Sequence, residues 1–223
     1  MIRRPNVVIT GANRGIGLAL AQHYAGAGYD VTAIVRRSSP QLEAIATTII
    51  DGIELTGAQG IAAVAAKLKR QAIDLLLNVA GIMQWETLEE LNFDKVRTQL
   101  EVNALAPLAL STALIPNMGE GAKIVFLTSR LGSIADSTSG KGYGYRISKA
   151  ALNMAAKTLS VDLKSRGIHV GLLHPGSVKT SLNKLGGQIE VSESVAGLTA
   201  RINELSAETS GKFLHQNGSE LAW

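Results

Sequence analysis

Short apolar segments alternate with longer helical segments along almost the entire chain. Predicted strands lie at 7–10, 31–35, 49–55, 74–79, 123–129 and 168–173, and a shorter one lies near Phe213. The run at 7–10 is continuously β-branched, which is typical of a strand buried on both faces. Helical patterns lie between them at 18–27, 58–70, 92–116, 145–166 and 192–204. Strands that alternate with helices form parallel sheets, so we expect an α/β fold. The prediction is a Rossmann-like, doubly wound parallel sheet with helices on both faces.

Length and composition narrow the possible partners. The 223 residues suit one domain over 1–223, and no repeat or linker divides them. The net charge of +4 comes from scattered basic residues, so we expect no nucleic-acid partner. The absence of cysteine excludes thiolate metal sites, and the histidines lack metal-ligand spacing, so no metal is expected. No apolar run suggests a signal peptide or a membrane span, which favours a cytoplasmic protein without a membrane partner.

Two local signals refine the expected elements. Pro107 lies inside the long helical stretch 92–116, where it has no N–H to donate, so we expect a kink or break there. Asn217-Gly218 is a strong turn signal near the end of the chain. The tail is therefore predicted to fold back as a hairpin.

A glycine-rich turn follows the first predicted strand and opens the first helix. Residues 10–17 read TGANRGIG, with glycines at 11, 15 and 17. Glycine allows a ligand close to the backbone, and the helix N-terminus offers free N–H groups to a pyrophosphate. The G-x-x-x-G-x-G spacing differs from the common dinucleotide fingerprint, and a simple helix-entry turn is the alternative. The position after the first strand favours phosphate binding.

Several motifs resemble, in the same order along the chain, those of the short-chain dehydrogenase/reductase family. The glycine turn resembles its cofactor loop, NVAG at 78–81 its N-N-A-G segment, and residues 175–180 its P-G-x-V-x-T segment. The resemblance is strongest to the C-factor and sniffer-type carbonyl reductases. The residues that match the family's catalytic tetrad are Asn103, Ser129, Tyr145 and Lys149.

The expected chemistry is a proton transfer at Tyr145. Tyr145 and Lys149 lie four residues apart on a predicted helix and share a face. The ammonium group, together with the positive charge of oxidised nicotinamide, is therefore expected to lower the pKa of the phenol. The resemblance implies that Tyr145 is the acid/base and that Ser129 holds the substrate oxygen. It also implies that Lys149 binds the nicotinamide ribose and that Asn103 holds a water molecule in a proton path.

The expected cofactor is NADP(H), with NAD(H) as the less favoured alternative. Val35-Arg36-Arg37 ends the second strand without the acid that would bind a ribose 2′-hydroxyl. Arginine can instead pair with a 2′-phosphate, and Arg14 can approach the same group. The cofactor-binding residues expected from the motifs and their positions are Gly11, Asn13, Arg14, Gly15, Ile16, Gly17, Arg36, Arg37, Glu54, Leu55, Asn78, Ala80, Gly81, Tyr145, Lys149, Pro175, Gly176, Val178 and Thr180.

Some positions depart from the family pattern. Val79 replaces the second asparagine of N-N-A-G, and the interval from Ser129 to Tyr145 is longer than usual. Ser133 is therefore an alternative catalytic serine, although Ser129 directly follows the strand. The segment 181–191 is expected to form a short substrate lid. Candidate walls of the substrate pocket are Met83, Trp85, Leu131, Ile134 and Tyr143.

The predicted function is hydride transfer between NADP(H) and a small or medium carbonyl or alcohol. One alternative is an NADP(H)-binding signalling or redox-sensing protein of C-factor type that rarely turns over. A second alternative is an epimerase or dehydratase on the same fold, but the chain has little room for the longer substrate domain that such an enzyme needs. The resemblance also implies a homodimer or homotetramer formed by the helices near 92–116 and 145–166.

Overall fold

All seven strands lie parallel in one sheet. The computed structural model describes residues 3–183 and 186–223. The strand order is β3-β2-β1-β4-β5-β6-β7, in which the chain reverses direction across the sheet after β3. This order confirms the predicted doubly wound fold. The strands are β1 (Asn6–Thr10), β2 (Asp30–Ile34), β3 (Thr48–Ile50), β4 (Leu75–Asn78), β5 (Lys123–Leu127), β6 (His169–His174) and β7 (Phe213–His215).

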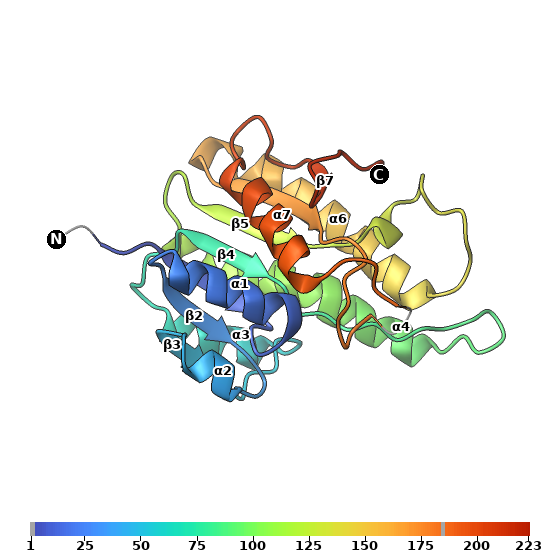
Figure 1. Cartoon of the computed structure of the whole chain (residues 1–223), viewed down its shortest axis with the longest axis horizontal. Coiled ribbons are helices and arrows are strands. Elements are labelled where there is room, and N and C mark those ends of the chain that lie inside the picture. Colours follow the sequence, from blue (N-terminus) through green and yellow to red (C-terminus); the bar gives the residue numbers. More distant parts are fainter. Residues whose placement is uncertain (1–2, 184–185) are drawn as a thin grey trace.

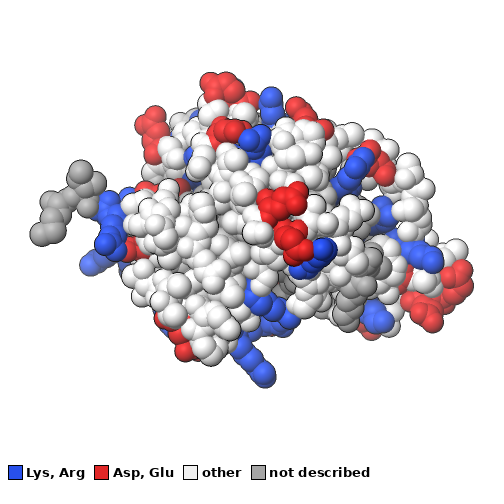
Figure 2. Space-filling model, viewed as in Figure 1, with Lys and Arg blue, Asp and Glu red and all other residues white. Residues whose placement is uncertain are grey.

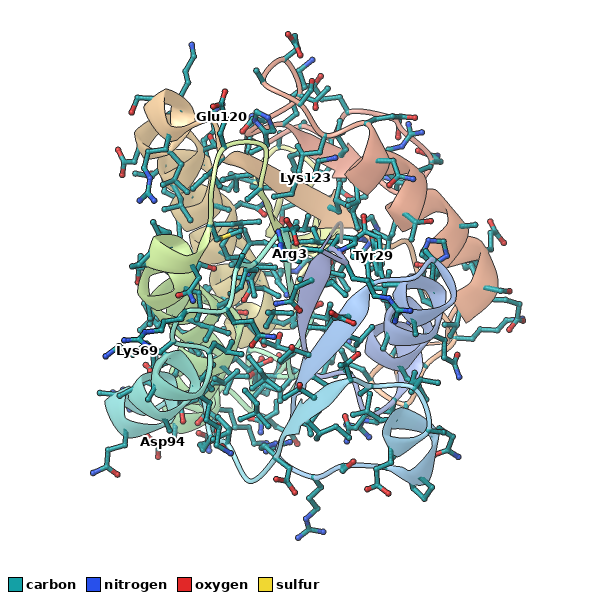
Figure 3. All side chains as sticks on the ribbon, turned by 90° about the vertical axis from the view of Figure 1, so that its left-hand side faces the viewer. Arg3, Tyr29, Lys69, Asp94, Glu120 and Lys123 are labelled. Atoms are coloured by element: carbon teal, nitrogen blue, oxygen red, sulfur yellow. The ribbon has the colours of Figure 1, made fainter. Side chains whose placement is uncertain are left out.

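Helices cover both faces of the sheet (Figures 1 and 3). Helices α1 (Gly15–Gly26) and α7 (Val191–Asn203) pack on one face. Helices α3 (Ala58–Lys67), α5 (Ala106–Leu114) and α6 (Tyr143–Asp162) pack on the other. Helix α4 (Phe93–Leu100) packs against α6. The short α2 (Pro40–Glu43) follows β2.

Successive strand residues alternate between the two cores. In β1, Val7 and Ile9 contact the α1/α7 layer, whereas Val8 belongs to the core under α3, α5 and α6. In β5, Phe126 is fully buried in the core under α3, α5 and α6, whereas Val125 is buried in the core under α1 and α7. Burial on both sides explains why these strands read as unbroken apolar runs.

The predicted break in the long helical stretch lies just before Pro107. A π-helical turn at Glu101–Leu105 separates α4 from α5 and contains Asn103. Pro107 has no N–H to donate to the carbonyl of Asn103 four residues earlier, which favours a wider turn at this point. A 3-10 turn at Ile115–Asn117 follows α5.

Two elements differ from the sequence prediction. The third strand is only Thr48–Ile50, because Gly52 has a φ of 68° and turns residues 53–55 out of the sheet. Helix α2 lies between the second and third predicted strands, where the sequence analysis assigns no element. The Ser39 side chain caps it by accepting a hydrogen bond from the Leu42 N–H (3.3 Å), and Pro40 takes the first helical position.

The tail folds back along β7, which confirms the predicted hairpin. The His215 N–H donates to the Ser219 carbonyl, and the Leu221 N–H donates to the Phe213 carbonyl, each at 2.8 Å. Leu214 and Glu220 form an antiparallel bridge across the turn.

Charged side chains at the amino end of the sheet form contacts within the fold. Arg3 and Lys123 lie at this end (Figure 3). Arg3 forms a two-point ion pair with Asp74, and Lys123 donates to the Ile202 carbonyl near the end of α7 (2.6 Å). Acidic and basic side chains are interspersed over the face in Figure 2. In the described residues, no helix is both long and apolar enough to cross a membrane.

Candidate functional site

A cleft of about 910 Å³ lies at the carboxyl ends of β1, β2 and β4. This is the edge of a doubly wound sheet at which ligands bind, and the volume is within the usual range for ligand sites. The expected cofactor-binding residues that line it are Gly11, Asn13, Arg14, Gly15, Ile16, Gly17, Arg36, Arg37, Glu54, Leu55, Asn78, Ala80, Gly81 and Thr180.

The glycine turn forms the floor of the cleft below the start of α1. A Cβ atom on Gly17 would collide with the carbonyl oxygen of Gly11, so the tight turn needs glycine there. Arg14 precedes α1 and makes no side-chain cap, which leaves the first N–H groups of the helix for a ligand. Thr180 lies over Gly15, with its methyl group 3.7 Å from where a Cβ would be. The turn and the 175–180 segment therefore meet across the cleft.

Two opposite charges lie at the end of the cleft beyond β2. The Arg36 guanidinium is 4.0 Å from the Glu54 carboxylate, and both side chains are mostly exposed. Such a long, solvated pair contributes little to stability. Arg36 and Arg37 therefore remain available to an anionic group of a ligand.

Tyr145, Ser129 and Lys149 meet beside this cleft. Ser129 follows β5, while Tyr145 and Lys149 lie on the first turns of α6. The Ser129 side chain hydrogen-bonds the Tyr145 hydroxyl, and the Lys149 Nζ lies 5.8 Å from the centroid of the Tyr145 ring. Gly81 lines the cleft next to them, since a Cβ there would lie 4.0 Å from Lys149 Nζ.

Burial raises the pKa of Tyr145 to about 12, and the hydrogen bond from Ser129 opposes this rise. This direction differs from the lowered pKa expected from the sequence. The physical reason is desolvation, which disfavours the phenolate. Lys149 does not reverse it at this distance. The neutral phenol, which is a proton donor, is thus the dominant form at neutral pH.

Lys149 is buried, with 5% of its surface exposed. Its ammonium group donates to the Leu127 carbonyl (2.8 Å), and it has no carboxylate partner among the described residues. Desolvation lowers its pKa from 10.5 to about 8. The ammonium form of Lys149 is therefore present at neutral pH, although burying it destabilises the folded state.

Asn103 links three segments around the site. Its side-chain oxygen accepts from the Ile82 N–H (2.8 Å), and its amide donates to the Ile82 carbonyl (2.9 Å) and to Ser148 Oγ (3.0 Å). Ser148 in turn donates to the Tyr145 carbonyl (2.8 Å). Asn103 thus ties the residues after β4 to the start of α6.

The geometry favours Ser129 over Ser133. Ser133 is 2% exposed, and its hydroxyl accepts a hydrogen bond from the Asp136 N–H within a turn (3.0 Å). Ser129 is the serine whose side chain bonds Tyr145.

The remaining expected residues lie outside the lining of the cleft. Pro175, Gly176 and Val178 follow β6, and Val178 is buried in a bridge to Ile189. Of the expected lid 181–191, residues 184–185 lie outside the described part. The expected substrate residues Met83, Trp85, Leu131 and Tyr143 are partly exposed, and Ile134 is 80% exposed. The Trp85 ring packs against Gly142 at the start of α6.

The sequence prediction missed several residues of this region. Ile82, Gln84, Thr98 and Val102 line the cleft, and Glu86 and Gln99 are buried beside it. Glu86 lies in an acidic, exposed-looking segment, and no pattern there signals burial.

Comparisons with known proteins agree with this geometry. The family model for short chain dehydrogenases matches residues 5–188. The 1-hydroxy-2-glutathionyl-2-methyl-3-butene dehydrogenase of Rhodococcus sp. (strain AD45) is 39% identical over 97% of this chain and 99% of its own. The C-signal of Myxococcus xanthus is 38% identical over 68% of this chain and 93% of its own.

A solved structure shows the same likeness. The NADPH-bound carbonyl reductase from chicken fatty liver has a TM-score of 0.89 and 32% identity, covering 100% of both chains. The resemblances to C-factor and to carbonyl reductases are therefore confirmed. With the parallel sheet, the glycine turn and the four motif residues at its carboxyl edge, these matches establish that the chain belongs to the short chain dehydrogenase family.

Proposed function

We propose that this protein exchanges a hydride between NADP(H) and a small or medium carbonyl or alcohol, with Tyr145 as the acid/base. The observation that carries the proposal is the meeting of Tyr145, Ser129 and Lys149 beside a cleft floored by the glycine turn. We further propose that residues 1–223 form a single cofactor-binding domain. We also propose that the protein is cytoplasmic, because NADPH is an intracellular reductant.

The residues of the cleft fit a dinucleotide. The free N–H groups at the start of α1 suit the pyrophosphate, and Arg14, Arg36 and Arg37 suit the 2′-phosphate of NADP. The Lys149 ammonium, which lies close to Gly81 at the cleft, suits the ribose hydroxyls. When bound, the nicotinamide supplies or accepts the hydride.

The protonation state of Tyr145 favours carbonyl reduction at neutral pH. The carbonyl oxygen accepts hydrogen bonds from the Ser129 and Tyr145 hydroxyls, and Tyr145 then transfers its proton to the developing alkoxide. The raised pKa keeps the phenol protonated before this step. The Lys149 ammonium, 5.8 Å from the ring centroid, stabilises the phenolate that remains.

The test is NADPH oxidation by the purified protein against a panel of aldehydes, ketones and quinones. Turnover well above the background without carbonyl supports an oxidoreductase. Tight NADPH binding without turnover on the whole panel would instead favour a C-factor-type sensor. The Rhodococcus relative is named as a dehydrogenase and the chicken relative as a carbonyl reductase, and both names support an oxidoreductase over a sensor.

Replacing Arg36 by alanine is expected to weaken NADPH binding roughly tenfold and NADH binding less than twofold. The loss of a charge-assisted contact to the 2′-phosphate is the reason, reduced by solvent screening because Arg36 is 70% exposed. Fluorescence titration with both cofactors measures the effect. Lys69→Ala, which removes an exposed cation outside the cleft lining, is the control. Equal losses for both cofactors would contradict the NADP assignment.

The exposed face of α6 supports a homo-oligomer. Ile147, Met154 and Val161 recur every seven residues and are 47%, 68% and 63% exposed. Phe93 on the neighbouring α4 is 63% exposed. A second copy pairing through α4 and α6 would bury this apolar face.

Met154→Glu is expected to weaken self-association at least tenfold, because it buries a carboxylate in an apolar contact. Light scattering coupled to size exclusion, over a range of protein concentrations, measures the change. Gln59→Glu, a change at another exposed position on α3, should leave the mass unaltered. A mass independent of Met154→Glu would rule this face out.

A further inference from the structure

A buried carboxylate and a buried amide lie against the start of the catalytic helix. Glu86 is 1% exposed and Gln99, on α4, is fully buried. The Gln99 amide donates to one Glu86 oxygen (2.6 Å), and the Gly144 N–H donates to the other (3.2 Å). The Gln99 oxygen accepts from the Gln84 N–H (2.8 Å). In the part of the chain that the structure describes, no lysine or arginine pairs with Glu86.

These bonds hold the backbone immediately before Tyr145. Glu86 fixes the Gly144 N–H, and its own carbonyl accepts from the Gly142 N–H (2.7 Å). On the other side of Tyr145, Ser148 bonds the Tyr145 carbonyl and is itself bonded by Asn103. The backbone is thus held both before and after the reacting phenol.

The packing at Gly144 leaves no space for another arrangement. A Cβ on Gly144 would collide with the Gln99 amide nitrogen and with the Glu86 carboxylate. The helix therefore approaches the Glu86–Gln99 pair as closely as its backbone allows.

We propose that Glu86 and Gln99 are positioning residues that set the location of Tyr145 relative to Ser129 and Lys149. This inference rests on the proposed acid/base role of Tyr145. Neither residue touches the reacting atoms. Their effect is transmitted through the first turn of α6, where a displacement of about 1 Å can lower a rate by up to about a hundredfold.

The hydrogen-bond pattern makes the pair testable by exchange. Glu86 accepts at both oxygens, and Gln99 donates to it while accepting from Gln84. In Glu86→Gln, every orientation of the two amides leaves one donor facing another donor. In the double variant Glu86→Gln/Gln99→Glu, Gln at 86 accepts from Gly144 and donates to Glu at 99, which accepts from Gln84. The exchange restores each of these three bonds and loses only the long contact from the Gln99 amide to the Lys95 carbonyl (3.4 Å).

The experiment measures kcat, KM and NADPH affinity with the best carbonyl of the panel. We expect Glu86→Gln to lower kcat about tenfold while the Kd for NADPH changes less than twofold. The exchanged double variant should recover to within about threefold of wild type. Amide hydrogen exchange over 142–148 gives a readout without turnover and should rise in the single variant and fall again in the double.

Two controls separate positioning from general stability. Asn117 makes a partly buried cross-link, donating to the Leu68 and Gln71 carbonyls at 2.7 and 2.9 Å. Asn117→Asp should lower the melting temperature without lowering kcat at 25 °C. Tyr145→Phe is assayed alongside. If it retains turnover, the proposed acid/base fails whatever Glu86 does.

The inference is overturned, with the proposed function intact, if Tyr145→Phe is inactive and Glu86→Gln keeps kcat within twofold of wild type. It is equally overturned if Glu86→Gln does not fold, or if the double variant is no more active than the single one. Those results would leave Glu86 with a structural role only.

Discussion

Replacing Tyr145 by phenylalanine is expected to lower kcat for NADPH-dependent carbonyl reduction roughly a thousandfold. The substitution removes the one hydroxyl that hydrogen-bonds Ser129 at the site and can transfer a proton to the carbonyl oxygen. General acid catalysis contributes about 10² to 10⁴ in rate. The ring itself remains, so NADPH affinity should change little. Steady-state rates at saturating NADPH, with binding measured separately, give both quantities.

Tyr143→Phe is the matched control, since it removes a hydroxyl two residues earlier on the same helix. It should keep kcat within about threefold of wild type. Turnover that survives Tyr145→Phe but is lost in Tyr143→Phe would transfer the acid/base role to Tyr143.

Replacing Lys149 by methionine is expected to lower kcat at least a hundredfold while leaving the protein at least as stable at pH 7. The rate falls because the cation that stabilises the phenolate is removed. Stability is kept because a pKa lowered from 10.5 to about 8 corresponds to roughly 3 kcal/mol of destabilisation of the folded state below pH 8. The Leu127 carbonyl, which loses its donor, offsets about 1–3 kcal/mol of the gain.

The sign of the pH dependence follows from the same lowered pKa. Between about pH 8 and 10.5 the unfolded wild-type chain binds more protons at Lys149 than the folded one, so wild-type stability rises with pH there. The methionine variant lacks this contribution, and its advantage should shrink by about 2–3 kcal/mol from pH 7 to pH 10. Urea unfolding at both pH values measures the difference. Lys157→Met, at an exposed position of α6, should show no such trend. A pH-independent difference would contradict the cost assigned to burying Lys149.

Much of the fold could be predicted from the sequence because its strands are buried on both faces. The apolar runs at β1, β4, β5 and β6 are recognisable as strands, and their alternation with helices predicts a parallel sheet. The ends of the elements were less certain where a local feature decides them that the apolar pattern does not show. β3 stops at Ile50 because a positive φ at Gly52 turns the chain, and α2 forms on a single serine cap.

The residues of the site likewise include some that the sequence predicts and some that it does not. Residues held by local motifs, such as the glycine turn or the spacing of Tyr145 and Lys149, could be named in advance. Glu86 and Gln99 could not, because their role depends on α4 packing against α6, which brings together segments 58 residues apart. The raised pKa of Tyr145 in the protein alone could not be predicted for a related reason, since desolvation depends on all the surroundings and not on one neighbour.

The hairpin that closes the chain limits how copies of the protein can join. An outer strand normally exposes unpaired N–H and C=O groups that can recruit a strand from another molecule. Here residues 219–221 occupy those groups on β7. Strand addition at that side is thereby blocked, so β7 cannot recruit a strand from a second copy of the protein.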